Sequence, residues 1–119
     1  MAFSCSAREI AGRVVLTVTG DVDLAVHALF EAEVEQAWPA SSSDLVIDCS
    51  GVSFLDSMGL RVLVHTMQRA TQNGRDFALA APSEPVLRVL ELAGVQSLFP
   101  VIEAVPDEES DPDPVGEFG

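Results

Sequence analysis

A serine at the expected start of a helix is the residue of this sequence best placed to do chemistry. Ser57 lies in the run Asp56-Ser57-Met58-Gly59-Leu60, after an apolar stretch and before an amphipathic one. A hydroxyl at such a place commonly caps the helix, because it accepts hydrogen bonds from free backbone N–H groups of the first turn. Capping is therefore the simplest role for Ser57, and a further role needs further observations.

Two features beside Ser57 favour a binding role. Gly59 occupies the first helical turn, where alanine would favour helix formation by about 1 kcal/mol. We interpret this glycine as keeping the surface beside the serine open to close approach. Met58, Val62 and Thr66 form a second stripe, on a helical face different from the one expected to meet the core. This stripe is a candidate docking edge, and the alternative is that its side chains only cover a neighbouring loop.

An enzymatic role would need partners that the sequence supplies poorly. A hydrolase would use Ser57 as nucleophile with His65 and Asp48 as helpers, but Leu55 stands where the nucleophile elbow has its first glycine. A two-component receiver domain would accept phosphate on Asp48 or Asp56, but such domains depend on a lysine and this chain has none. We therefore expect a protein that is not an enzyme.

The charge of the chain excludes several partners. Its 119 residues include 19 acidic side chains against six basic ones, all arginine, for a formal net charge of −13. Such a surface repels nucleic-acid phosphates and anionic lipid. The missing lysine also removes Schiff-base chemistry and the P-loop lysine. We expect no cofactor, no nucleic-acid partner and no membrane partner.

The cysteines and histidines suggest no metal or redox chemistry. Cys5 and Cys49 lie in apolar runs, where a reduced thiol behaves as a small apolar side chain. His27 and His65 are far apart in the sequence, and no Cys or His pair has metal-ligand spacing. No apolar run approaches the roughly 20 residues that cross a bilayer, and no secretory signal is visible. We expect a cytoplasmic protein, with a monomer as the default state.

The elements that must position Ser57 begin with a predicted hairpin and a helix. Alternating apolar and polar residues predict strands over 3–8 and 14–19, joined by a turn at Gly12-Arg13. An apolar residue then recurs every fourth position over 26–38, which predicts an amphipathic helix. Asp23 precedes this helix and is expected to cap it.

The central part of the chain alternates strands and helices. The apolar run 45–47 predicts a central strand covered on both faces, followed by a loop that contains Gly51 and Phe54. The helix that starts near Ser57 should end at Asn73-Gly74. Further predicted elements are a strand around Phe77 and Leu79, a helix between a capping Ser83 and a terminating Gly94, and an edge segment over 98–102.

These elements add up to one α/β domain, residues 1–105, with a small mixed β-sheet and about three main helices packed on it. Residues 106–119 differ from it in composition. They contain six acidic residues, no basic residue and three of the seven prolines. Because such a segment has little apolar surface to offset its ordering entropy, we expect a disordered acidic tail.

The order of these elements resembles the STAS domain family, and more narrowly its anti-sigma factor antagonists. In that family an apolar strand ending in Asp leads through a short loop to D-S-x-G-L at the start of a helix. Here Leu45 to Asp48 match the strand and 56–60 match the motif, with Met at position 58 where many members carry a small residue. Gly20-Asp21-Val22-Asp23 is similar to the family's G-x-x-D turn. The resemblance covers residues 3–103.

The resemblance implies a function and a site. By resemblance, Ser57 accepts a phosphate from an anti-sigma factor that is also a serine kinase using ATP. The unphosphorylated form binds this partner and releases the sigma factor, and a separate serine phosphatase resets the switch. We expect the helix N-terminus to tolerate the phosphate, so that the charge acts at the interface and not on the fold. The alternative is a STAS domain that serves as a scaffold, or that regulates a transporter, a lipid-transport complex or a stress-signalling complex, without a Ser57 switch.

Candidate partner contacts lie around this serine. They are Asp21, Asp23, Asp56, Met58, Gly59, Arg61 and Val62. Asp23 is alternatively only a cap, and Asp56 either orients the serine hydroxyl or touches the kinase. Arg61, one helical turn beyond Ser57, either pairs with the phosphate, pairs with a partner carboxylate or is simply solvated.

Overall fold

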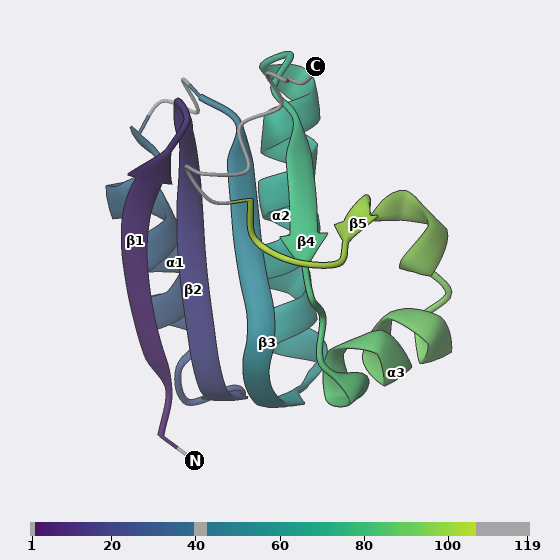
Figure 1. Cartoon of the computed structure of the whole chain (residues 1–119). Coiled ribbons are helices and arrows are strands. Elements are labelled where there is room, and N and C mark those ends of the chain that lie inside the picture. The colour runs from purple at the N-terminus through teal and green to yellow at the C-terminus, as the bar shows by residue number, and fades with distance from the viewer. Residues whose placement is uncertain (1, 40–42, 107–119) are drawn as a thin grey trace.

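A computed structural model describes residues 2–39 and 43–106 of the chain. In this part, three helices pack on a five-stranded mixed sheet with the order β1-β2-β3-β4-β5, which confirms the predicted α/β fold (Figure 1). The elements are β1 (Ser4–Ile10), β2 (Arg13–Val22), α1 (His27–Ala37), β3 (Leu45–Leu55), α2 (Ser57–Gln72), β4 (Phe77–Ala80), α3 (Glu84–Leu92), a 3-10 turn (Gln96–Leu98) and β5 (Val101–Ile102).

The predicted hairpin is confirmed. β1 pairs antiparallel with β2 in a register that joins Ser4 to Thr19 and Ile10 to Arg13. The turn between them falls at Ala11 and Gly12, whose φ angles are 54° and 81°. The remaining neighbours in the sheet, β2 to β5, all run parallel. Parallel strands need crossover connections, and α1, α2 and α3 supply them.

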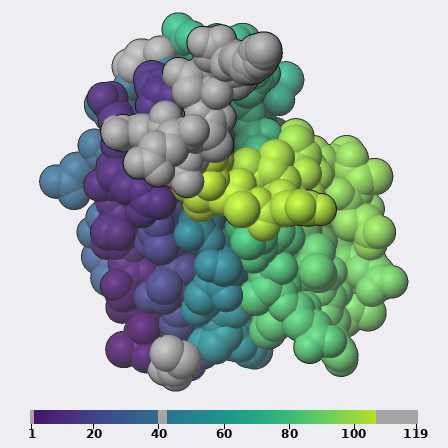
Figure 2. Space-filling view, viewed as in Figure 1, coloured from purple at the N-terminus to yellow at the C-terminus, as the bar shows by residue number. Residues whose placement is uncertain are grey.

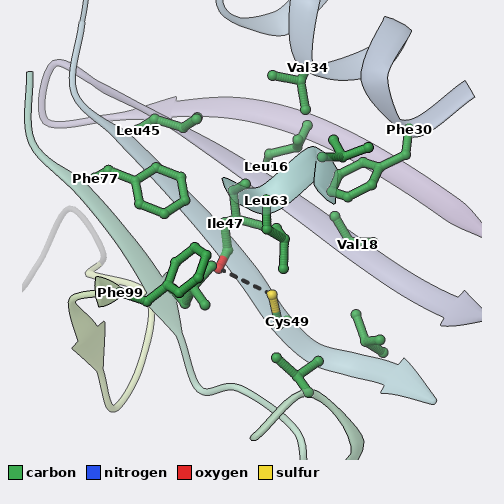
Figure 3. Close-up of a cluster of buried hydrophobic side chains, with 14 of the residues drawn as sticks. Leu16, Val18, Phe30, Val34, Leu45, Ile47, Cys49, Leu63, Phe77 and Phe99 are labelled. Atoms are coloured by element: carbon green, nitrogen blue, oxygen red, sulfur yellow. Dashed lines mark hydrogen bonds between the residues drawn. The ribbon is translucent and has the colours of Figure 1, made fainter. Parts of the chain in front are cut away.

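The main core lies between the sheet and the helices. Figure 3 shows its centre, where Leu16 and Ile47 from the sheet meet Phe30 and Val34 of α1 and Leu63 of α2. All five side chains are at most 2% exposed. β2 and β3 are apolar over long runs because both of their faces are covered, as expected for the central strands of a parallel sheet.

The other face of the sheet carries a smaller apolar cluster. Ile10, Val15, Val46 and Ala80 are buried there, and Ile102 and Val105 pack against them. The chain after β5, coloured yellow in Figures 1 and 2, crosses this face in front of β3 and β4. This face therefore has a cover made from the chain itself.

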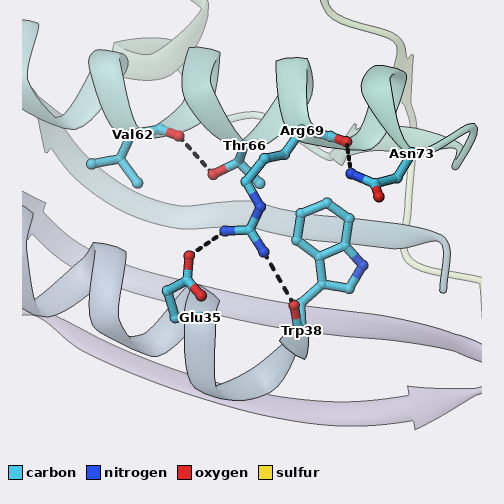
Figure 4. Close-up of polar contacts among 6 residues, drawn as sticks. All are labelled: Glu35, Trp38, Val62, Thr66, Arg69 and Asn73. Atoms are coloured by element: carbon cyan, nitrogen blue, oxygen red, sulfur yellow. Dashed lines mark hydrogen bonds and ion pairs between the residues drawn. The ribbon is translucent and has the colours of Figure 1, made fainter. Parts of the chain in front are cut away.

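One polar cluster ties α1 to α2 (Figure 4). The Arg69 guanidinium pairs with the Glu35 carboxylate, donates to the backbone oxygen of Trp38 at 3.4 Å and lies 4.9 Å from the centre of the Trp38 ring. A planar cation over an aromatic face is a stabilising arrangement. The cluster holds the C-terminal end of α1 against α2.

Two local predictions are wrong. The predicted loop at Gly51 and Phe54 is strand, because β3 continues to Leu55 alongside the end of β2 with shifts in register. Ser83 does precede α3, but its hydroxyl makes no cap and instead donates to the Val52 carbonyl at 2.7 Å. Each apparent local signal was overridden by a contact with a distant strand.

Cys5 and Cys49 are free thiols, and Cys49 is buried. No helix within the described ranges has both the length and the apolarity needed to cross a membrane. The tail expected at 106–119 lies, apart from its first residue, outside the described residues.

Candidate functional site

The candidate site lies where β2 and β3 end and α2 begins. Val22 and Leu55 are partners at the ends of the two strands, and the Asp56 backbone N–H donates to the Val22 carbonyl at 3.2 Å. The short segment between β3 and α2 is therefore tied to the sheet. Because carboxyl ends of parallel strands meet at one edge, the residues after β2 and after β3 share this end of the molecule.

Asp56, and not Ser57, caps α2. The Asp56 Oδ1 atom accepts hydrogen bonds from the backbone N–H groups of Met58 and Gly59, each at 3.0 Å. Ser57 is the first residue of the helix, and its side chain is exposed. The Ser57 hydroxyl makes no hydrogen bond to any described residue. The prediction that Ser57 serves as the cap is wrong, and its hydroxyl is open to solvent.

Gly59 is required by internal packing. The residue is buried, and a Cβ atom added there would lie 2.6 Å from Leu55 Cδ1, 2.8 Å from Val22 Cγ1 and 3.0 Å from the Val22 carbonyl oxygen. The prediction that this glycine keeps an outer surface open is therefore wrong. Gly59 allows the first turn of α2 to lie directly on the ends of β2 and β3.

The second stripe on α2 is largely internal. Val62 and Thr66 are each 4% exposed, and the Thr66 hydroxyl donates to the Val62 carbonyl at 2.6 Å. α1 covers this face of α2, so Val62 and Thr66 belong to the helix pair and not to an outer docking edge. Only Met58, which is half-buried, keeps part of its side chain accessible. Arg61 is exposed on the same helix.

The two acids at the end of β2 organise the local backbone. Asp21 accepts a hydrogen bond from the Ser53 hydroxyl at 2.7 Å, and this bond lowers the pKa of the Asp21 carboxyl. Asp23 accepts from the Ala25 N–H at 3.0 Å, which forms a turn ahead of α1. Because α1 begins at His27 after Val26, with no side-chain cap, the prediction that Asp23 caps the helix is wrong.

Two apolar side chains at this end are exposed, which the sequence did not predict. Leu24, in the turn after β2, is 66% exposed. Phe54 is 48% exposed and is the register partner of Asp21. Phe54 was an apolar residue in an expected loop, which was an available signal, whereas Leu24 directly followed the expected cap Asp23 and carried no such signal. Exposed apolar side chains near the ends of β2 and β3 are candidates for contact with a protein partner.

A cleft lies between α1 and α2, beside the first turns of both helices. It has a volume of about 360 Å³ and is lined by His27, Glu31, Met58, Arg61, Val62 and His65. The fold thus brings together two histidines that are distant in sequence. The Nδ1 atom of His27 lies 2.9 Å from the Leu24 carbonyl oxygen, and so connects the cleft to the turn after β2. Among the described residues, no cluster of His, Cys, Asp and Glu could hold a metal ion.

The structure keeps Asp48, one of the two helpers that a hydrolase would need, away from Ser57. Asp48 pairs with Thr17 and Ala80 in the middle of the sheet, and its carboxylate accepts from the backbone N–H and hydroxyl of Ser50. Leu55 follows Asp48 by seven positions along β3, which corresponds to roughly 20 Å. Asp48 is therefore out of reach of the Ser57 hydroxyl.

Comparisons with known proteins agree with one another. The model of the STAS domain matches residues 4–108. The anti-sigma-F factor antagonist RsfB of Mycobacterium tuberculosis is 30% identical over 96 residues, which cover 81% of this chain and 78% of RsfB. The solved structure of an anti-sigma factor antagonist from Mycobacterium paratuberculosis superposes with a TM-score of 0.80 at 26% identity, over 92% of each chain.

A third comparison concerns the fold alone. The phosphorylated form of the Bacillus cell fate determinant SpoIIAA is 19% identical and has a TM-score of 0.65, over 92% of this chain and 96% of that one.

Proposed function

The chain belongs to the STAS domain family, and we propose that it is an anti-sigma factor antagonist in which Ser57 controls partner binding. The observation that carries this proposal is the exposed Ser57 hydroxyl, which Asp56 relieves of the capping role. A serine needed for the fold could not be modified without loss of structure. Ser57 can gain a phosphate while the cap remains in place.

The relatives support the antagonist role at the level of the family. RsfB is named for its action on an anti-sigma-F factor, and it matches most of this chain. The fold also accommodates phosphorylation in one case, since SpoIIAA was solved in a phosphorylated form. Applied to this chain, these names indicate an anti-sigma factor as partner.

We propose the following cycle. The unphosphorylated chain binds an anti-sigma factor and thereby releases a sigma factor. The anti-sigma factor is also a serine kinase, which transfers a phosphoryl group from ATP to the Ser57 hydroxyl. A serine phosphatase removes it and restores binding. The cycle takes place in the cytoplasm, between a monomer of this chain and its partner.

The partner surface in this proposal combines apolar and polar groups at one end of the domain. Leu24 and Phe54 supply exposed apolar area, and Met58 and Arg61 extend the surface along α2. Phosphorylation adds about −1.5 to −2 charges at the start of α2, next to Met58. An unpaired charge that becomes buried on binding costs several kcal/mol, and each 1.4 kcal/mol is tenfold in affinity.

Mass spectrometry of the Ser57 peptide tests the proposal. The chain is incubated with ATP and with each kinase-type anti-sigma factor of the organism, and the Ser57→Ala variant serves as the control. We expect phosphate on the Ser57 peptide with at least one of these kinases, and none on the variant. Phosphate elsewhere in both proteins, or in neither, would contradict the assignment of Ser57.

A further inference from the structure

A phosphate on Ser57 would find the helix N-terminus partly occupied. The Asp56 carboxylate accepts from the Met58 and Gly59 N–H groups, and the Leu60 N–H donates to the Asp56 carbonyl at 2.9 Å. The N–H groups of Met58 and Gly59, two of the first-turn donors that favour an anion, are therefore taken, while the Leu60 N–H makes the first bond within the helix. The phosphate would also lie next to the Asp56 carboxylate, and two neighbouring anions repel each other. The Asp56 cap thus weakens the stabilisation that the helix N-terminus gives to this phosphate, and another positive group can add to it.

Arg61 is placed to add to this stabilisation. Residues four apart on a helix lie one above the other, with Cβ atoms about 5–6 Å apart. Ser57 and Arg61 have this spacing, and both are exposed. Within the described ranges the Arg61 guanidinium makes no hydrogen bond or ion pair, in contrast to Arg69 on the same helix, which pairs with Glu35.

The surroundings of Arg61 leave its side chain room to move. Arg61 lines the cleft of about 360 Å³ between α1 and α2. The charged and titratable groups that share this cleft are His27 and Glu31 from α1 and His65 from α2. None of them holds the guanidinium in an ion pair, so it can turn toward Ser57 without breaking a hydrogen bond or ion pair to any described residue.

We propose that Arg61 is the intramolecular counter-charge for a phosphate on Ser57, and that this pairing draws the guanidinium out of the α1–α2 cleft. The inference rests on the proposed function, which places the phosphate on Ser57. Phosphorylation then changes the partner surface twice, because it adds an anion at the start of α2 and withdraws a cation from the cleft one turn further on. Arg61 stabilises the phosphate after it has been transferred and takes no part in the transfer itself.

The test uses the full chain with phosphoserine inserted genetically at position 57, so that no kinase is required. A ³¹P NMR titration gives the pKa of the second phosphate ionisation, which is about 6 in an isolated phosphoserine. A neighbouring cation stabilises the dianion and lowers this pKa. We expect Arg61→Gln to raise the midpoint by about 0.2–0.7 pH unit, as for an exposed ion pair. Asp56→Asn should lower it, because a neighbouring anion is removed while the cap is kept.

Arg75→Gln is the matched control, because Arg75 is an exposed arginine beyond the opposite end of α2. It should leave the midpoint unchanged. The Nε–H resonance of Arg61 should also shift when Ser57 is phosphorylated, at a fixed pH. Equal midpoints for the unsubstituted phosphoprotein and Arg61→Gln would overturn the proposal, and so would an equal effect of Arg75→Gln.

These outcomes are separable from the proposed function. If a kinase modifies Ser57 and the midpoints are equal, the switch stands and Arg61 has no part in it. If Arg61→Gln raises the midpoint and no kinase modifies Ser57, Arg61 does pair with the phosphate, but the proposed regulatory cycle is contradicted.

Discussion

The Asp56 carboxylate accepts a hydrogen bond from the Gly59 backbone N–H at 3.0 Å, and Ser57, which lies between these two residues in the sequence, is exposed and makes no side-chain hydrogen bond to a described residue. The cap and the candidate phosphate acceptor are therefore adjacent but separate residues. This division lets one side chain maintain the helix while the next one changes its charge.

The Asp56 cap can be measured through stability. Asp56→Ala removes the acceptor of two backbone N–H groups, and we expect a loss of about 1 kcal/mol in the free energy of unfolding. Asp56→Asn keeps an oxygen acceptor at the same place and should cost at most a few tenths of that value. Urea denaturation of both variants provides the comparison. An alanine variant as stable as the parent would show that this cap contributes nothing.

Gly59→Ala tests the packing of α2 on the sheet. The added methyl group improves helix propensity by about 1 kcal/mol. It also collides with Leu55 and Val22, because the added Cβ atom would lie 2.6 Å from Leu55 Cδ1 and 2.8 Å from Val22 Cγ1. Overpacking of this kind costs about 1–3 kcal/mol, so we expect a less stable protein.

Ser57→Ala is the matched control for this substitution, since it lies two residues away in the same helical turn. Its hydroxyl makes no hydrogen bond within the described part of the chain, so the free energy of unfolding should stay the same. If Gly59→Ala were as stable as the parent, the close contact would be relieved by movement and the account of this glycine would be wrong.

The exposed apolar side chains give a prediction about binding. Leu24→Asn and Phe54→Asn remove apolar area from the proposed partner surface and should each weaken binding to the anti-sigma factor by about tenfold or more. Stability should change little, because the two side chains are 66% and 48% exposed. Isothermal titration calorimetry provides the affinities.

Leu92→Asn is the control for this pair. Leu92 is 80% exposed at the end of α3, outside the proposed surface. We expect an unchanged affinity. An equal loss of affinity for Leu92→Asn and Leu24→Asn would contradict the proposed location of the partner surface.

Much of the fold follows from periodic patterns in the sequence. The alternation in residues 3–8 and 14–19 predicts the hairpin, and the apolar residues Phe30, Val34 and Trp38 do face the core. These patterns are reliable because several apolar side chains at a regular spacing all pack against the same surface. The position of Ser57 at the start of α2 is predicted for the same reason.

The details that the sequence could not supply depend on distant partners. Ser83 has the position of a cap, but the Val52 carbonyl lies within reach of its hydroxyl. Gly59 suggested an open surface, whereas Val22 and Leu55 fill the space beside it. Asp56 and Ser57 are both good capping residues, and only the backbone geometry decides between them.

The buried thiols predict an alkaline loss of stability. Burial raises the pKa of Cys49 from 9.0 to about 12, with a smaller contribution from the Asp48 charge. The folded state then keeps its proton at a pH where the unfolded chain loses it. The contribution of this thiol to the free energy of unfolding is therefore fully present below pH 9. It falls as the pH rises toward 12, by about 1 kcal/mol per pH unit.

The composition reduces interference from other titrating groups in this measurement. The chain has no lysine and no tyrosine, so few other side chains titrate between pH 9 and 12. Burial also raises the pKa of Cys5, which is the second contributor. Cys49→Ala should show a flatter decline than the parent in urea denaturation. A decline that is as steep in the variant would assign the effect to other groups.

The most direct test of the central claim is the affinity of the anti-sigma factor for two forms of this chain, one unphosphorylated and one with phosphoserine at position 57. Calorimetry measures both, and circular dichroism verifies that both are folded. We predict that the phosphorylated form keeps the fold and binds at least about 100-fold more weakly, which corresponds to about 2.7 kcal/mol. Equal affinities of the two folded forms would contradict the account.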